Sequence, residues 1–119
     1  MDTSVLVVDD DAGFRSLAVR ILRGCGFRVI GEASTRASGM AAALDLRPDA
    51  VLVDVRLPDG DGIRLGHALA ALPWSPRIVL TSSDNDAAGE VAASDGGLLP
   101  FVPKDQLPTA PLLRLLAID

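Results

Sequence analysis

Apolar residues fill several short stretches of the chain at consecutive positions, and not at alternate ones. Such continuous runs are typical of β-strands that are covered on both faces. The run at residues 51–55 is interrupted only by Asp54. The pattern predicts five short strands, at residues 5–8, 28–31, 51–55, 78–80 and 98–102.

The segments between these strands carry apolar residues at the spacing of an amphipathic helix. The first such helix covers residues 14–22 and is closed by Gly24. Ser34 or Thr35 is expected to cap a second helix, which stops before Pro48. Three further helices are predicted, at residues 63–72, at residues 86–94 where the pattern is weak, and at residues 112–117.

Strands and helices thus alternate along the chain with short connections between them. Parallel neighbouring strands require a crossover, and the crossover is almost always right-handed. We therefore predict an α/β fold in which a doubly wound parallel sheet is covered by helices on both faces. The length of 119 residues suits a single domain of this kind, residues 1–119.

The residues just past the predicted strands are the candidates for chemistry. In doubly wound sheets, ligands bind beyond the carboxyl ends of the strands. At these ends lie Asp9, Asp10 and Asp11 after the first strand, Asp54 at the third, Thr81 and Ser82 at the fourth, and Lys104 after the fifth. If the fold is as predicted, these side chains converge on one edge of the sheet.

An acidic cluster of this kind calls for a cation. Two like charges about 4 Å apart repel by ~4 kcal/mol at an effective dielectric constant of about 20. Oxygen ligands without a nearby histidine or cysteine suit Mg²⁺, which keeps several of its own waters. A divalent ion and the ammonium group of Lys104 would then hold a phosphoryl group. Asp54 is the best-placed nucleophile, and Thr81 could donate its hydroxyl to a phosphoryl oxygen.

Each of these residues also has a plainer structural interpretation. The three aspartates could simply cap the first helix, because carboxylates favour a helix N-terminus. Thr81 alone would be an ordinary residue at a strand end, and Lys104 alone an ordinary solvated lysine. Three acids in a row exceed what capping needs, however, and the joint placement of all these groups favours a functional site.

Composition narrows the classes of function. The chain carries 16 acidic and 11 basic residues, for a net charge of −5, so this domain has no electrostatic footprint for binding nucleic acid. No apolar run approaches the ~20 residues of a membrane span, and the early aspartates argue against a signal peptide. The single cysteine, Cys25, suits a reducing cytoplasm, so we expect a cytoplasmic protein without membrane contact.

Four motifs in order resemble the receiver domain of bacterial response regulators. They are Val8-Asp9-Asp10, the run from Val53 to Gly62, Leu80-Thr81-Ser82, and Phe101-Val102-Pro103-Lys104. Three further segments look most like the NarL/LuxR type of regulator: Gly31-Glu32-Ala33, Arg47-Pro48-Asp49, and Lys104 followed by Asp105. The spacings of 44, 27 and 23 residues that separate Asp10, Asp54, Thr81 and Lys104 are similar to those of that family. The resemblance covers essentially the whole chain and implies a flavodoxin-like sheet with strand order 2-1-3-4-5 and five helices.

The resemblance also implies roles for particular residues. Asp54 would accept a phosphoryl group, with Mg²⁺ held by Asp10, Asp54 and the main-chain carbonyl of Arg56, and with Asp9 acting through bound water. Phosphate binding would fall to Thr81, Ser82 and Lys104, and Thr81 and Phe101 would form a switch pair. The domain would then be a phosphoacceptor switch that promotes its own phosphorylation and dephosphorylation, and not an enzyme acting on a separate substrate.

Partners follow from the same resemblance. A sensor histidine kinase of a two-component system would supply the phosphoryl group. Phosphorylation would change the face built from the fourth helix, the fifth strand and the fifth helix. The terminal helix is more apolar than one buried stripe requires, so this C-terminal face could form a homodimer. Two settings stay open: a stand-alone regulator, or a receiver whose DNA-binding output domain for transcription regulation lies outside this chain.

Two other functions stay open at this point. A phosphatase of the haloacid dehalogenase type would use Asp9 and Asp11 as its Asp-x-Asp pair, but it would leave Asp54 without a role. A receiver-like module that never takes phosphate would serve only for docking. A dinucleotide-binding fold is weaker, because aspartates stand where glycines should approach a pyrophosphate.

Overall fold

A computed structural model describes residues 3–83, 99–107 and 116 of the chain. Its main element is a five-stranded sheet in the order β2-β1-β3-β6-β7, in which every neighbouring pair is parallel. The strands are β1 (Ser4–Val8), β2 (Arg28–Ala33), β3 (Ala50–Asp54), β6 (Arg77–Ser82) and β7 (Phe101–Pro103). When only the five strands of this sheet are numbered along the chain, β6 is the fourth and β7 the fifth, so the order is the predicted 2-1-3-4-5. The predicted fold class is therefore confirmed.

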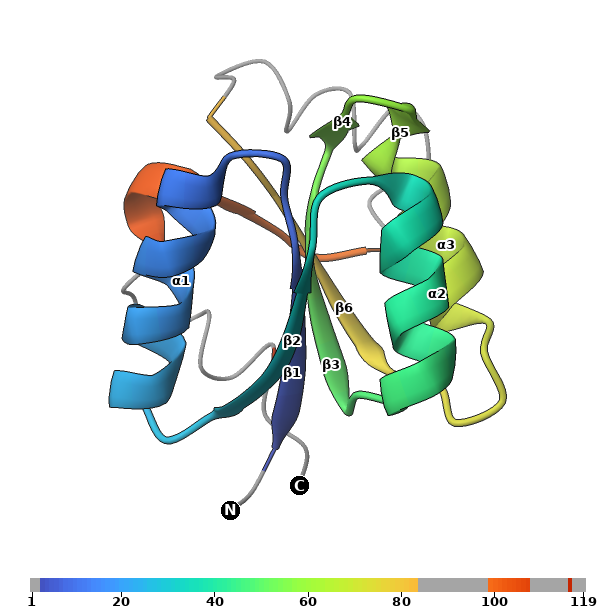
Figure 1. Ribbon diagram of the computed structural model, residues 1–119, viewed down its shortest axis with the longest axis horizontal. Helices are drawn as coiled ribbons and strands as arrows, with labels where there is room; N and C mark the ends of the chain where they lie inside the picture. The colour runs from blue at the N-terminus through green and yellow to red at the C-terminus, as the bar shows by residue number, and fades with distance from the viewer. Residues whose placement is uncertain (1–2, 84–98, 108–115, 117–119) are drawn as a thin grey trace.

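Helices cover both faces of this sheet. Figure 1 shows α1 (Ala12–Gly24) on one face, with α2 (Arg36–Leu46) and α3 (Gly62–Ala70) together on the other. A short 3₁₀ helix, η1 (Lys104–Gln106), follows β7. The predicted fourth helix, at residues 86–94, lies outside the described residues. So does the predicted fifth, at residues 112–117, apart from Leu116, which is helical and buried.

Successive residues of the central strands point to opposite faces of the sheet and belong to two apolar clusters, one on each face. Leu6, Val8, Val51, Val53 and Leu80 pack with residues of α2 and α3. Val5, Val7, Leu52 and Val79 pack with Ala18 and Leu22 of α1 and with Leu116. Both faces of these strands are therefore buried, which is why their sequences are apolar at consecutive positions.

Polar caps fix the starts of the helices. Asp11 caps α1 by accepting a hydrogen bond from the N–H of Phe14. Thr35 caps α2 in a reciprocal arrangement with Ser38, and Asp61 caps α3. The capping interpretation of the acidic triplet is therefore right for Asp11. The choice between Ser34 and Thr35 falls on Thr35.

Several details differ from the prediction. The fifth strand of the sheet, predicted at residues 98–102, begins only at Phe101, because its register with β6 starts at the Leu80 and Phe101 positions. Strand β2 runs on to Ala33, because β1 continues to pair with it as far as the Val8 and Ala33 positions. The segment after β3 contains a small antiparallel pair, β4 (Arg56–Leu57) and β5 (Gly60–Asp61), which the apolar pattern does not predict and which lies at the top of Figure 1. Among the described residues, no helix is long and apolar enough to cross a membrane.

Candidate functional site

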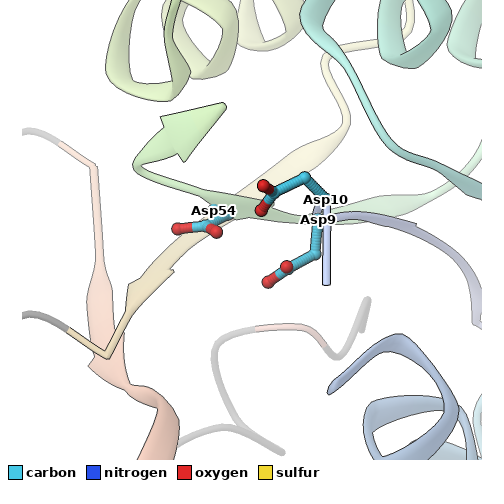
Figure 2. A group of neighbouring side chains, drawn as sticks. All are labelled: Asp9, Asp10 and Asp54. Carbon is cyan, nitrogen blue, oxygen red and sulfur yellow. The ribbon is translucent and has the colours of Figure 1, made fainter. Parts of the chain in front are cut away.

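Three aspartates meet at the carboxyl edge of the sheet. Asp9 and Asp10 follow β1, and Asp54 ends β3, which is the neighbour of β1. One carboxylate oxygen from each lies within 4.8 Å of one from each of the other two, and Figure 2 shows the three side chains around a common space. Asp9 and Asp54 are buried, whereas Asp10 is exposed. The predicted acidic cluster therefore exists, and its donors are all oxygen atoms.

Main-chain and side-chain hydrogen bonds hold Asp9 in place from several sides. Its N–H donates to the carbonyl of Ala33 at 2.9 Å, and its Oδ1 accepts from the N–H of Asp11 at 2.9 Å. The guanidinium of Arg15 donates to the carbonyl of Asp9 at 2.5 Å and also pairs with Glu32 at 3.2 Å. Sequence reasoning missed Arg15, since an arginine on the polar side of a helix gives no specific signal.

Lys104 is the cation that faces the acidic cluster. Its Nζ lies 2.8 Å from Oδ2 of Asp9 and 3.4 Å from Oδ2 of Asp54. Burial alone would lower the pKa of this ammonium group, but the two carboxylates outweigh that effect and raise the pKa above its ordinary value. Lys104 is therefore charged at neutral pH and offsets part of the negative charge of the site.

The carboxyl group of Asp54 has a pKa well above its ordinary value. Burial raises the pKa of Asp54 from 3.8 to about 6, with a further contribution from the charge of Asp9. The N–H of Arg56, which donates to Oδ1 of Asp54 at 3.2 Å, and the ammonium of Lys104 act in the opposite direction. A partly desolvated carboxylate with a perturbed pKa, lying beside a cation, is a typical feature of a functional site.

The other predicted site residues, Thr81, Ser82 and Phe101, lie on the two strands beyond β3, namely β6 and β7. Thr81 is paired with Asp54 in the register of β3 and β6 and is buried, and its Oγ1 has no hydrogen-bond partner among the described residues. Ser82 is buried at the end of β6. Phe101 lies opposite Leu80 on β7, half-buried against the cluster beneath α2 and α3. The hydroxyl of Thr81 is thus available to a ligand bound near Asp54.

A family model described as the response regulator receiver domain matches residues 5–114 of the chain. The chain belongs to this family. The KDP operon transcriptional regulatory protein KdpE of Escherichia coli is 36% identical over 102 residues, which are 86% of this chain and 44% of KdpE. The DNA-binding response regulator MtrA of Mycobacterium tuberculosis H37Rv is 37% identical over 114 residues, covering 88% of this chain and 49% of MtrA.

Solved structures of other receiver domains share the fold of this chain. The receiver domain of NarL from Mycobacterium tuberculosis has a TM-score of 0.79 and 27% identity, with 96% of each chain covered. The receiver domain of CheB from Thermotoga maritima shares the fold, with a TM-score of 0.78 at 24% identity, over 100% of this chain and 99% of that one. The receiver domain spans less than half the length of KdpE and MtrA, the two curated relatives above.

The β4–β5 hairpin of the receiver domain is tied to α2 by one side chain. The carboxylate of Asp59 accepts hydrogen bonds from the N–H of Arg36 at 2.7 Å and of Ala37 at 3.0 Å. Gly60 adopts a φ of +146°, and a Cβ there would come within 2.5 Å of the Arg36 guanidinium. The segment that follows Asp54 is therefore anchored to the start of a helix by a residue that sequence reasoning missed.

Asp59→Asn is expected to lower the stability of the receiver domain at pH 7. Hydrogen bonds from Arg36 and Ala37 hold the pKa of Asp59 below its ordinary value of 3.8. Stability from a lowered pKa is fully present above the unfolded value and is lost as pH falls through the folded value. The difference in urea midpoint between wild type and variant should therefore be constant above about pH 3.8, and it should shrink to nothing as the pH falls further, through the lower folded-state pKa.

Asp45→Asn, an exposed change near the other end of α2, provides the control and should not lower the midpoint at pH 7. Equal midpoints for wild type and Asp59→Asn at pH 7 would show that the hydrogen bonds from Arg36 and Ala37 to Asp59 contribute nothing to stability.

The acidic cluster satisfies the chemical requirements of a site for a hard divalent cation. Its carboxylates come from two adjacent strand ends, their oxygens are close together, and Lys104 offsets only part of their charge. The buried Thr81 hydroxyl supplies a donor that no described residue uses. A cation and a phosphoryl group placed here would both find partners that the folded chain already provides.

Proposed function

We propose that Asp54 accepts a phosphoryl group from the phosphohistidine of a sensor histidine kinase in a Mg²⁺-dependent reaction. The observation that carries the proposal is the position of Asp54 between two acids and one ammonium group. A carboxylate oxygen of Asp54 would attack phosphorus, and the phosphorus–nitrogen bond to histidine would break with its electron pair going to the ring. No general base is needed, because the attacking carboxylate carries no proton.

The metal would be held by Asp9, Asp10, Asp54 and the main-chain carbonyl of Arg56, with Asp9 acting through water. Bound there, Mg²⁺ would neutralise charge on the phosphoryl oxygens. Lys104 would pair with one phosphoryl oxygen, while Thr81 and Ser82 would donate hydrogen bonds to others. The chemistry of these groups supports the roles, since the acids accept a cation and the others are donors.

Switching would follow from the movement of Thr81 toward the phosphoryl group. Its hydroxyl, for which none of the described residues is a hydrogen-bond partner, gives a reason for the side chain to reorient once an acceptor is present. Phe101, half-buried on the neighbouring strand, would turn inward in response. The predicted homodimer face includes the fourth and fifth helices, which lie outside the described residues, so that part stays a prediction.

The larger setting of the domain also belongs to the proposal. KdpE and MtrA are named as a transcriptional regulator and a DNA-binding response regulator, and each is about twice as long as the matched region. A DNA-binding output domain joined to this receiver is therefore proposed. Histidine kinases present their phosphohistidine in the cytoplasm, which is the location that the proposal implies.

The test is to identify the aspartate that becomes phosphorylated. The chain is incubated with acetyl phosphate and Mg²⁺ and then reduced with borohydride, which converts an aspartyl phosphate into homoserine. Mass spectrometry of the peptides should find homoserine at position 54, and omission of Mg²⁺ should remove it. Homoserine at position 9 would indicate the phosphatase alternative, whereas no homoserine would indicate a docking module; either result contradicts the proposal.

A further inference from the structure

The ammonium group of Lys104 has a third neighbour besides the two carboxylates. Its Nζ lies 4.3 Å from the centroid of the Phe14 ring, over the face of the ring. This distance is well within the range of a cation–π interaction, in which the negative face of the ring attracts the cation. Phe14 lies in the first turn of α1, far from Lys104 in sequence, and Figure 1 shows η1, which begins at Lys104, close to that turn.

The ring is positioned by the same loop that positions the acids. The N–H of Phe14 donates to Oδ1 of Asp11 at 3.1 Å, and the N–H of Asp11 donates to Oδ1 of Asp9 at 2.9 Å. A short series of hydrogen bonds therefore links the main chain at Phe14 to the carboxylate of Asp9. Phe14 also packs against the apolar cluster beneath α1, which restricts the ring further. Its place relative to Lys104 is set by the architecture of the site.

Phosphorylation would change the two carboxylate partners of Lys104 but not the ring. Esterification of Asp54 replaces a carboxylate by an acyl phosphate, and a metal held by the acids competes with Lys104 for the charge of Asp9. The Phe14 ring carries no titratable or metal-binding group, so its attraction for the ammonium persists in every state. It also shields one side of the ammonium from water, which strengthens the remaining electrostatic contacts.

We propose that Phe14 is a positioning residue that holds Lys104 in place for the incoming phosphoryl group. The inference rests on the proposed function, because it assigns Lys104 to a phosphoryl oxygen. Phe14 acts only through Lys104 and does not touch the phosphoryl group. The aromatic face is the feature that matters, so tyrosine should replace phenylalanine and leucine should not.

Lys104 is the single lysine of the chain, which makes the contact directly observable. In protein labelled with ¹³C and ¹⁵N lysine, the side-chain protons of one residue are seen by NMR. The ring current of Phe14 should shift the protons next to Nζ upfield in the wild type and in Phe14→Tyr. Phe14→Leu should lose the shift, whereas an unshifted wild type would overturn the contact itself.

The functional readout is the affinity for beryllofluoride, a phosphoryl mimic, in saturating Mg²⁺. A cation–π contact of about 0.5–2 kcal/mol corresponds to a loss of roughly twofold to thirtyfold in Phe14→Leu, with affinity retained in Phe14→Tyr. The affinity for Mg²⁺ alone should change by less than about twofold. Ile21→Ala, at a half-buried residue of α1 that packs against the same cluster, should lower stability without weakening beryllofluoride binding.

The outcomes separate the two proposals. If wild type binds beryllofluoride and Phe14→Leu binds it equally well, the positioning role is wrong and the proposed function stands. If Ile21→Ala weakens binding as much as Phe14→Leu does, the effect is one of packing and the positioning role is again wrong. If the wild type does not bind beryllofluoride with Mg²⁺, the proposed function fails, and the positioning role fails with it.

Discussion

Asp54→Asn is expected to abolish the response of the domain to beryllofluoride and acetyl phosphate in the presence of Mg²⁺. The variant keeps the shape of the side chain but replaces the nucleophilic carboxylate by a neutral amide, which removes one negative charge of the acidic cluster. Lys104 is not left without a partner, because Asp9 is the nearer of its two carboxylates. A loss of response in this variant would therefore reflect chemistry at Asp54 and not a collapse of the site.

The same variant is expected to stabilise the metal-free domain at neutral pH. Burial raises the pKa of Asp54 to about 6, so folding disfavours the ionised form. The raised pKa corresponds to at most ~3 kcal/mol, which partial contact with solvent reduces to about 1–2 kcal/mol. The sign follows from linkage: this destabilisation is absent below the unfolded pKa, grows as pH rises toward 6, and is complete above it.

Urea unfolding of wild type and Asp54→Asn without metal measures this effect. The variant should be more stable at pH 7, and the difference should vanish as the pH approaches 3.8. Adding Mg²⁺ should stabilise the wild type more than the variant, since ligand binding to the folded state shifts the unfolding equilibrium. Asp45→Asn, an exposed change on α2, is the control for removal of one charge. A variant that is less stable than wild type at pH 7 contradicts the role assigned to burial.

Gly62→Ala is expected to destabilise the domain by about 3 kcal/mol or more, which is the upper end of the usual cost of adding atoms to a well-packed site. A Cβ at Gly62 would come within 1.8 Å of the carbonyl oxygen of Asp54 and 2.8 Å of its carbonyl carbon. Both atoms belong to the main chain of β3, so no side-chain rotation can relieve the clash. The N–H of Gly62 also donates to the carbonyl of Val55 at 2.8 Å, which ties the start of α3 to this strand end.

Chemical denaturation of Gly62→Ala checks this expectation, and phosphorylation of Asp54 in the folded fraction should also be slowed. Gly24→Ala is a matched control, because a Cβ at Gly24 in α1 would meet no atom within 4 Å. That change should be neutral or stabilising by up to ~1 kcal/mol, since alanine is the better helix former. Equal stabilities for the two variants would mean that the close approach at Gly62 does not constrain the chain.

The sequence alone was sufficient for the fold class and for the position of the candidate residues at the strand ends. Continuous apolar runs predicted strands buried on both faces, and the two clusters of the core confirm that interpretation. Parallel strands bring their carboxyl ends to one edge, so Asp9, Asp10 and Asp54 could be expected together before any distance was known. Local chemistry also limited the N-cap of the second helix to Ser34 or Thr35, and the structure places it at Thr35.

Only the tertiary structure decided which of these groups touch one another. The contact between Lys104 and Asp54 joins residues 50 positions apart, and the Phe14 ring beside Lys104 looked from the sequence like an ordinary core residue. The hydrogen bonds from α2 to Asp59 likewise depend on how the β4–β5 hairpin meets that helix. The tight packing of Gly62 depends on how the start of α3 meets the end of β3. Periodicity reports which face of an element is buried. Contacts between distant side chains depend on strand register and helix placement, which the packing of the whole domain fixes.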